Sequence, residues 1–400
     1  MTFKTSLCAG VALSVAMLAA GAANAQDTTV AWKGAPQWTN DTLTFKVRGR
    51  TYFDYIYQDV DRQTGVDFAA SNSRIRTARL GVEGTWNANW AYKAEVQLAR
   101  GAAEWEDLIL EYKPTDTTSI LVGNFKTVSL ENITSSRYTT FMERGPYNDV
   151  LNVGRVMNIQ AKTNGQNWTA AIAASGDSIN SADVATNSAT GSKEVFGVNG
   201  RFTFAPIDLD ETKLHLGVWA RYRNREDQAN FNYAVRNNTA YGAQYASTGA
   251  IGVRDTQIGL EGALVHKNFS LQGEYANISV DRPANADADL KAFYVYGSWF
   301  PTGEMRRYEA NKGEFNRTKV LNPVTSGGMG ALELAVRYDN VDLTDVVGAG
   351  EYSAVTLGAN WYPHPYVRFM ANYSMAQNDN PAVGADVDVN TFQVRAQFDF

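Results

Sequence analysis

The sequence predicts an all-β fold, a transmembrane antiparallel β-barrel of about 16 strands with a loop folded into its interior. Three observations predict it: a leader typical of exported proteins, a period-two alternation of apolar and polar residues, and a final alternating segment that ends on Phe400. A soluble sandwich would also alternate, but it gives no reason for an apolar last residue or for aromatic residues at strand ends.

Residues 1–25 have the features of a secretory signal peptide. Lys4 is followed by an apolar run over 7–20, and Ala23-Asn24-Ala25 matches a cleavage site. The apolar run is too short to span a bilayer, so we expect cleavage after Ala25 and export. The expected domains are a signal peptide (1–25), a short periplasmic N-terminal segment (26–41) and an outer-membrane barrel (42–400).

Composition and charge exclude several classes of protein. The 400 residues carry a formal net charge of −6, and loss of Lys4 with the leader takes it to −7. Cys8, the only cysteine, also leaves with the leader, which excludes a disulfide, a thiolate metal site and a cysteine nucleophile. After the leader no apolar run reaches the roughly 18 residues of a membrane-spanning helix. We expect no metal and no cofactor.

The last ten residues show the alternation most clearly. The apolar face carries Phe392, Val394, Ala396, Phe398 and Phe400, and the polar face carries Thr391, Gln393, Arg395, Gln397 and Asp399. A period of two indicates a strand with one apolar and one polar face. A terminal strand that ends in Phe resembles the recognition signal of outer-membrane barrels. The same alternation recurs in 43–55, 213–225 and 331–340.

The connections between these segments differ in length. Short turns are expected at the periplasmic rim, at Thr85–Asn89, Pro114–Thr118, His266–Asn268 and Pro363–Pro365. Longer polar stretches are expected as outer loops, at 56–72, 127–154, 175–192, 226–254, 279–289, 303–329 and 376–389. A barrel of this size leaves an open aqueous lumen.

The polar faces carry more basic than acidic residues. A charge on the lipid face would be costly, so the alternation assigns thirteen basic and eight acidic side chains to the lumen. The predicted anion pathway comprises Lys46, Arg48, Arg50, Arg79, Arg201, Arg221, Arg223, Arg225 and Arg337. Guanidinium groups suit phosphate and carboxylate because they offer two parallel donors. The alternative is that these charges only hold the barrel wall rigid.

Residues 123–155 are the best candidate for the loop that folds inward and narrows the channel. The predicted constriction residues are Lys126, Glu131, Arg137, Glu143, Arg144 and Arg155. We expect Arg137 and Arg144 to act on passing anions, with Glu131 and Glu143 orienting them. The alternative is that the loop charges satisfy one another and only brace the loop.

Several stretches resemble the phosphate-selective porin family, the porin O/P group. They are WKGAP (32–36), RTARLGVEG (76–84), GNFK, SLE, SSR and FMER between 123 and 144, FPTGE (300–304), ELAVRYDNVDL (333–343) and LGANWYPHPYVRFMANY (357–373). The resemblance covers essentially the whole mature chain. FMER and NWYP are its most specific motifs.

The resemblance implies a 16-stranded trimeric porin with a basic constriction. Lys126, Arg137 and Arg144 would lie on or near the constriction loop, and Arg48, Arg50 and Arg79 would face it from the wall. The chain departs from the family in its acidic overall charge and in the carboxylates that dilute its basic residues, Glu83, Glu95 and Glu261. These departures favour a general anion preference over strict phosphate selectivity.

The sequence therefore predicts a passive porin of the outer membrane that prefers small anions, phosphate or pyrophosphate among them. Its expected partners are small anionic solutes, outer-membrane lipid and lipopolysaccharide, the barrel-assembly machinery and two further copies in a homotrimer, without nucleic acid. The alternatives are a non-selective diffusion porin and a barrel hydrolase. We expect no enzyme, because none of the three histidines, His215, His266 and His364, has an identifiable serine partner.

Overall fold

The computed structural model describes residues 29–32, 34–99, 101–180, 194–225, 231–283, 285–380 and 385–400. The expected signal peptide and its cleavage site lie outside these residues.

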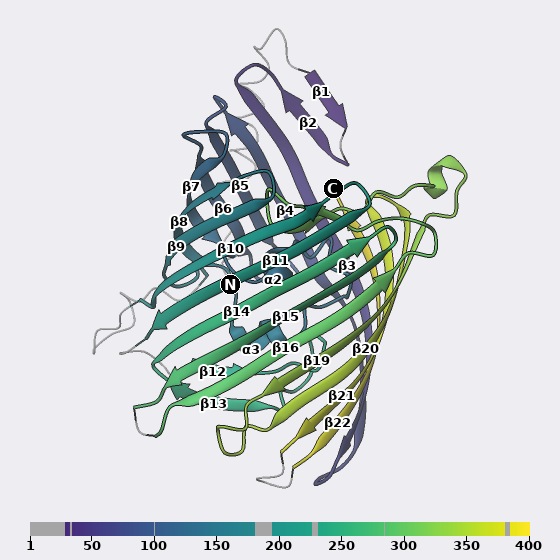
Figure 1. The fold of residues 1–400 in the computed structure, drawn as a ribbon. Coiled ribbons are helices and arrows are strands. Elements are labelled where there is room, and N and C mark those ends of the chain that lie inside the picture. Colours follow the sequence, from purple (N-terminus) through teal and green to yellow (C-terminus); the bar gives the residue numbers. More distant parts are fainter. Residues whose placement is uncertain are drawn as a thin grey trace, which may run out of the picture.

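The chain forms a closed antiparallel barrel (Figure 1). The main sheet has 18 strands; β1 (Thr29–Trp32) and β2 (Pro36–Thr39) form a hairpin at its rim, and the other 16 close because β22 pairs with β3. The prediction of about 16 strands is confirmed. The barrel strands are β3 (Leu43–Arg62), β4 (Phe68–Trp86), β5 (Trp90–Gln97), β6 (Glu104–Tyr112), β7 (Thr118–Phe125), β8 (Val156–Asn164), β9 (Trp168–Ser175), β10 (Phe196–Asp208), β11 (Thr212–Asn224), β14 (Arg254–His266), β15 (Phe269–Asp281), β16 (Ala288–Trp299), β19 (Ala331–Asp342), β20 (Glu351–His364), β21 (Val367–Asp379) and β22 (Val387–Asp399).

The alternation read from the sequence separates the two faces of the wall. On β19, Leu334, Val336 and Tyr338 are 40–50% exposed on the outer face, whereas Glu333 and Arg337 are 1% exposed on the inner face. An outer face of apolar side chains fits hydrocarbon, where only closed barrels and helices satisfy every backbone group. No helix among the described residues is long and apolar enough to cross a membrane.

The pairing of β22 with β3 that closes the barrel continues up to the last residue, Phe400. The amide of Gly49 donates to the carbonyl of Phe400 at 3.0 Å, and the amide of Phe400 donates back to Gly49 at 3.0 Å. The Phe400 ring lies over this position, where a Cβ on residue 49 would approach the ring to 2.5 Å. Glycine at 49 therefore makes room for the terminal aromatic ring.

The two rims differ, and one segment lies at the rim opposite to the one expected. Short turns join β4–β5, β6–β7, β8–β9, β10–β11, β14–β15 and β20–β21, at the rim where β22 ends. The expectation that 303–329 is an outer loop is wrong, because it joins β16 to β19 at this same short-turn rim. Length alone suggested the outer rim; the segment is long because it carries the hairpin β17 (Arg307–Glu309) and β18 (Glu314–Asn316), followed by η2 (Val324–Ser326).

Part of the inner wall is apolar and covered by loops. Residues 126–155, the inward loop, run from β7 to β8 and carry α2 (Leu130–Ile133) and α3 (Pro146–Leu151), which lie inside the barrel (Figure 1). Its buried Tyr147, Val150 and Leu151 join one apolar cluster with inward side chains of β15 and β16. The hairpin β12 (Phe231–Ala234) and β13 (Ser247–Gly252) contributes to the same cluster. The fold class, including an inward-folded loop, is confirmed.

We predict that removing 398–400 prevents most of the barrel from assembling while export continues. The truncation deletes the backbone pairs with Gly49 and leaves two strand edges without partners in lipid. The yield of heat-modifiable protein in outer-membrane fractions measures assembly. Phe392→Ala is the matched control, because Phe392 is a lipid-facing aromatic of the same strand and the substitution keeps the backbone pairing of β22 with β3. A normal yield from the truncated chain would contradict the prediction.

Candidate functional site

Among the described residues, two sizeable cavities lie inside the barrel, one toward each rim. The outer cavity, toward the long loops, has a volume of about 430 Å³, and the inner cavity, toward the short turns, has about 1060 Å³. Thr127 and Asn132 line both. The start of the inward loop therefore lies between the two cavities.

The inner cavity is strongly basic. Fourteen basic side chains line it, against five acidic ones. The basic residues are Lys46, Arg48, Arg50, Arg79, Lys93, Lys113, Lys126, Arg137, Arg144, Arg155, Lys162, Arg201, Lys312 and Arg317, and the acidic ones are Glu83, Asp107, Glu111, Asp116 and Glu314. An excess of one sign of charge in a cleft concentrates ions of the other sign.

The outer cavity holds the predicted arginine series of β11. Arg221, Arg223 and Arg225 all line it. Arg223 forms two hydrogen bonds to Asp255 at 2.5 and 3.0 Å, and Arg225 donates to Asp177 at 3.0 Å. Two of the three guanidinium groups are thus already neutralised by carboxylates. Arg221 instead donates to the carbonyl of Leu151 and to the side-chain amide oxygen of Gln257.

Three lining cations lack such neutralisation. Among the described residues no carboxylate oxygen lies within 4.0 Å of the charged nitrogens of Lys126, Arg144 or Arg221. Lys126 and Arg144 lie on the inner cavity and Arg221 on the outer one. A passing anion would therefore meet three basic side chains that no carboxylate of the described residues contacts.

Lys126 and Arg144 are held by backbone carbonyls of the inward loop. Lys126 donates to the carbonyl of Asn132 at 3.4 Å, and Arg144 donates to those of Glu131 at 2.8 Å and Thr134 at 2.5 Å. These carbonyls belong to α2 and to its C-cap residue Thr134, at the end of the helix where carbonyls lack helical partners. Burial, with Arg144 beside it, lowers the pKa of Lys126 well below its ordinary value, and an anion beside this amine would favour its charged form.

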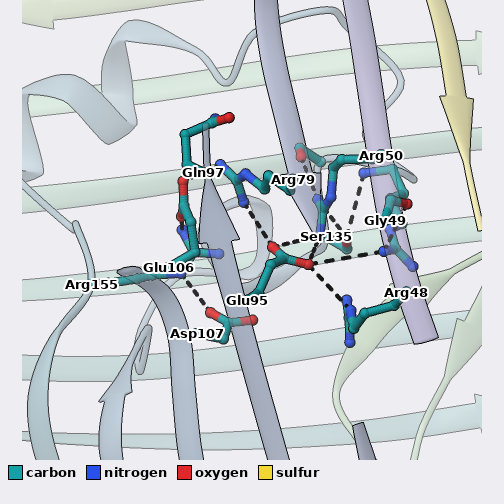
Figure 2. Close-up of polar contacts among 12 residues, drawn as sticks. Arg48, Gly49, Arg50, Arg79, Glu95, Gln97, Glu106, Asp107, Ser135 and Arg155 are labelled. Carbon is teal, nitrogen blue, oxygen red and sulfur yellow. Dashed lines mark hydrogen bonds and ion pairs between the residues drawn. The ribbon is translucent and has the colours of Figure 1, made fainter. Parts of the chain in front are cut away.

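On the wall facing the loop, three arginines surround one carboxylate (Figure 2). Glu95 of β5 contacts Arg48, Arg50 and Arg79 at 3.0–3.2 Å. Arg137 of the inward loop lies 3.9 Å away. All four arginines line the inner cavity, as the sequence predicted for wall and loop, whereas the carboxylate itself does not.

Two β-bulges place additional charged side chains in this region. The register between β3 and β4 skips Arg76, and that between β5 and β6 sets Glu106 and Asp107 against Glu95. Bulges redirect side chains. Arg155 ends the inward loop by contacting both Glu106 and Asp107 at 2.5 Å. Simple alternation misses these carboxylates and Arg76, and only a register known from strand pairing could have located them.

The structure places Glu131, Glu143 and Arg337 away from both cavities. Glu143 accepts from Arg76 at 2.9 Å and from Arg395 at 2.7 Å, between the loop and the wall. Burial opposes its ionisation, yet the two arginines hold the pKa of Glu143 at about 2.

Glu131 contacts Arg337 at 3.5 Å and accepts from the amide of Gly145 at 3.1 Å. Arg337 is 1% exposed and also donates to Asp339 at 2.8 Å. These contacts, like those of Glu143, tie the inward loop to itself and to the wall.

Arg201 anchors the hairpin of the short-turn rim. It donates to Glu261 at 2.6 and 2.8 Å and to the carbonyl of Gly313 at 2.8 Å. The same carboxylate contacts His215 Nε2 at 3.0 Å, and the other ring nitrogen of His215 lies 2.6 Å from the Tyr308 hydroxyl. The hairpin is thus fixed at two points. His215 is 1% exposed and has a structural role.

One family model matches most of the chain. Residues 45–400 match the model described as phosphate-selective porin O and P. The chain belongs to this porin family. The family comprises channels of the outer membrane rather than enzymes, in agreement with the sequence prediction.

Two relatives resemble this porin over most of its length. A protein of Caulobacter vibrioides described as uncharacterized is 31% identical over 391 residues, covering 93% of the porin and 77% of that protein. Porin O of Pseudomonas aeruginosa is 27% identical over 404 residues, covering 90% of each chain.

Solved structures share the fold of the porin. An anion-selective porin from Comamonas acidovorans has a TM-score of 0.56 at 12% identity, covering 89% of this porin and all of that chain. OmpT of Vibrio cholerae, in its trimer form, has a TM-score of 0.53 at 14% identity, covering 90% and 100% of the two chains.

We predict that Glu143→Gln makes the porin noisy without altering its selectivity. The substitution weakens the ion pairs with Arg76 and Arg395 behind the inward loop, so the loop should fluctuate. Planar-bilayer recordings should show frequent brief closures and an unchanged reversal potential in a KCl gradient. Glu211→Gln, the same change of charge at an exposed turn, is the control. A shifted reversal potential would instead give Glu143 the orienting role inferred from the sequence.

The outer cavity should respond to pH. Burial raises the pKa of Asp149 to about 7 against the effect of Arg236, its partner at 3.0 Å. As pH falls through about 7, Asp149 gains a proton and loses its negative charge while Arg236 stays cationic, so anion preference should rise. Reversal potentials at about pH 8 and about pH 6 measure this change. Asp149→Asn should remove this part of the response; an identical response in that variant would exclude Asp149 as its source.

Proposed function

We propose that this porin is a passive, homotrimeric channel that prefers small anions. The observation that carries the proposal is the route formed by Arg221, Lys126 and Arg144, which line successive cavities without a carboxylate partner among the described residues. The charge that lines the narrow part of a pore, rather than the total charge of the protein, sets its ionic selectivity. An overall acidic chain is therefore compatible with an anion channel.

The class of solute follows from the hydrogen-bond donors that line the two cavities. Guanidinium and ammonium groups suit chloride, carboxylates and phosphates, and the family name supports phosphate or pyrophosphate among the solutes. The basic lining extends this argument to the wall, where Arg48, Arg50 and Arg79 border the inner cavity with Lys46. We propose that these wall residues, with Arg137 and Arg155 of the inward loop, attract anions into the inner cavity.

The assembly and its location complete the proposal. The trimer form of OmpT supports a homotrimer, and the exposed apolar outer face supports insertion among outer-membrane lipid and lipopolysaccharide. We propose export through a signal peptide cleaved after Ala25, followed by insertion by the barrel-assembly machinery through the terminal strand.

A non-selective diffusion channel is the second candidate. The pairing of Arg223 and Arg225 with carboxylates favours it, because paired guanidinium groups attract a free anion less strongly. The same pairing argues for a moderate, general anion preference rather than tight phosphate binding.

We predict that Lys126→Gln, Arg144→Gln and Arg221→Gln each lower the chloride-to-potassium permeability ratio. Together they should lower it by about tenfold, because each removes a basic side chain that no carboxylate of the described residues contacts. Reversal potentials in KCl gradients provide the measurement.

Lys267→Gln is the matched control, because its ammonium group lies on an exposed turn and should leave the ratio unchanged. Cation preference in the wild type would overturn the proposed function. An unchanged ratio in the triple variant would move the selectivity to other residues.

A further inference from the structure

One connection at the short-turn rim exposes apolar side chains and has no charge. Residues 320–332, which follow the hairpin β17–β18 on the way to β19, include no charged side chain. Within them Leu321, Val324 and Met329 are 50%, 45% and 69% exposed. By contrast, the β10–β11 turn at the same rim exposes the carboxylate of Glu211. Apolar side chains gathered on one exposed segment mark a surface that binds a partner or a membrane.

Residues 321–330, which we call the rim knob, form a compact turn closed by hydrogen bonds within its own backbone. The amide of Gly328 donates to the carbonyl of Pro323 at 3.1 Å, and that of Gly330 donates to the carbonyl of Asn322 at 2.8 Å. A Cβ on residue 328 would approach the Asn322 carbonyl oxygen to 2.2 Å, so this close turn requires glycine. Backbone groups that are bonded within the segment can enter a poorly hydrated environment at little cost.

The rim knob lies against the lipid-facing side of the wall. The indole N–H of Trp361, an outward side chain of β20, donates to the carbonyl of Met329 at 2.8 Å. Trp361 is 43% exposed and stacks on Phe369 of β21 at a ring-centre distance of 5.5 Å. Figure 1 shows the knob, in green, reaching outward from the rim past the strands of the wall. Its apolar surface is thus continuous with the aromatic side chains that a barrel places at the membrane interface.

The wall beside the rim knob is hollowed. Trp361 borders a hollow of about 610 Å³ on the outer face, together with the aromatic rings of Phe53 and Phe369. The small side chains of Ala359 and Ala371, which face each other across β20 and β21, also line it. Because this face of the wall meets hydrocarbon, the surface next to the knob fits the acyl chains of a phospholipid.

We propose that the rim knob is an interfacial anchor that binds the phospholipid leaflet at the short-turn rim, with Leu321, Val324 and Met329 among the acyl chains. Interfacial segments bury their apolar side chains roughly 5–10 Å into the boundary between head groups and acyl chains. Three side chains are too few for a stable interface between proteins, which buries on the order of 1,000 Å² or more. The same connection carries the hairpin β17–β18, whose Lys312 lines the inner cavity, so the anchor holds the outer end of a segment that reaches the pore.

The test places a fluorescent label on one valine at a time. Cys8 is the only cysteine of the sequence, so Val324→Cys in a Cys8→Ser background offers a single thiol for labelling with bimane. The matched controls are Val336→Cys, on the lipid-facing side of β19, and Val347→Cys, 89% exposed in the β19–β20 loop at the opposite rim. Each labelled protein is reconstituted in phosphatidylcholine vesicles. Fluorescence quenching is then measured with a nitroxide on the phospholipid and, separately, with iodide in the water.

We expect the lipid nitroxide to quench the label at 324 as strongly as that at 336, and at least about twofold more strongly than that at 347. Iodide should give the opposite order. Leu321→Asn with Met329→Asn removes apolar side chains from the rim knob and should lower lipid quenching at 324 by about twofold or more, with quenching at 336 unchanged. Unchanged quenching at 324 in that variant would overturn the proposal, because the apolar side chains would then not hold the knob in the leaflet.

Two other results would also overturn the anchor. Quenching at 324 by iodide alone would place the rim knob in water, and protection from both quenchers would place it under protein, such as a second copy of the chain. Should Val324→Cys fail to give a heat-modifiable barrel, Met329→Cys carries the label on the same surface and decides the question by the same readout.

The anchor and the proposed function fail separately. Lipid quenching at 336 without lipid quenching at 324 would overturn the anchor alone. Absence of lipid quenching at 336 would overturn insertion of the barrel wall, on which the anchor rests. The ion preference is measured by the reversal potential, which does not depend on these labels.

Discussion

Inside a bilayer every backbone N–H and C=O must find its partner within the protein, and the rest of this structure depends on that constraint. It requires the sheet to close, which the pairing of β22 with β3 achieves. Closure leaves each strand with one face toward lipid and one toward the interior, so charged side chains of the wall are confined to the interior. The closed wall therefore concentrates charged side chains in the lumen. Ion pairs such as that of Arg395 with Asp54, at 2.7 Å, stabilise these buried charges in the folded protein.

Within the lumen, carboxylates and arginines divide into two roles according to position. Glu143, Glu131 and Glu274 lie where the inward loop meets the wall; Glu274 accepts the amides of Leu130 and Glu131 at 3.0 and 2.7 Å. They hold the loop in place. The cations that remain without a carboxylate face the cavities. A net-negative chain can in this way present a basic passage, because some of its acidic residues lie behind the surface that solutes reach and basic residues outnumber acidic ones along the inner cavity.

The sequence was sufficient to predict the features that depend on the alternation of apolar and polar residues along each strand. The alternation around Leu334 and Arg337 correctly separated lipid and interior faces, and the alternation that ends on Phe400 correctly predicted the terminal strand. Alternation could not predict the two bulges, since an extra residue such as Arg76 depends on pairing with a distant strand. It could not orient Glu131 and Glu143 either, because an irregular loop has no fixed period. Segment 303–329 was misplaced because length, rather than strand direction, was used to choose its rim.

The apolar inner wall beneath the inward loop has a consequence for how the protein comes apart. Tyr147, Val150 and Leu151 pack there in the way of a small water-soluble domain, with Tyr147 against Tyr294 at a ring-centre distance of 5.5 Å. The barrel is stabilised by hydrogen bonds shielded in lipid, whereas this packing is stabilised by exclusion of water and is weakened by urea. The inward loop and the barrel wall are therefore stabilised by different chemistry, and we expect denaturants to weaken the packing of the loop first. Its melting would widen the passage inside a barrel that is still intact.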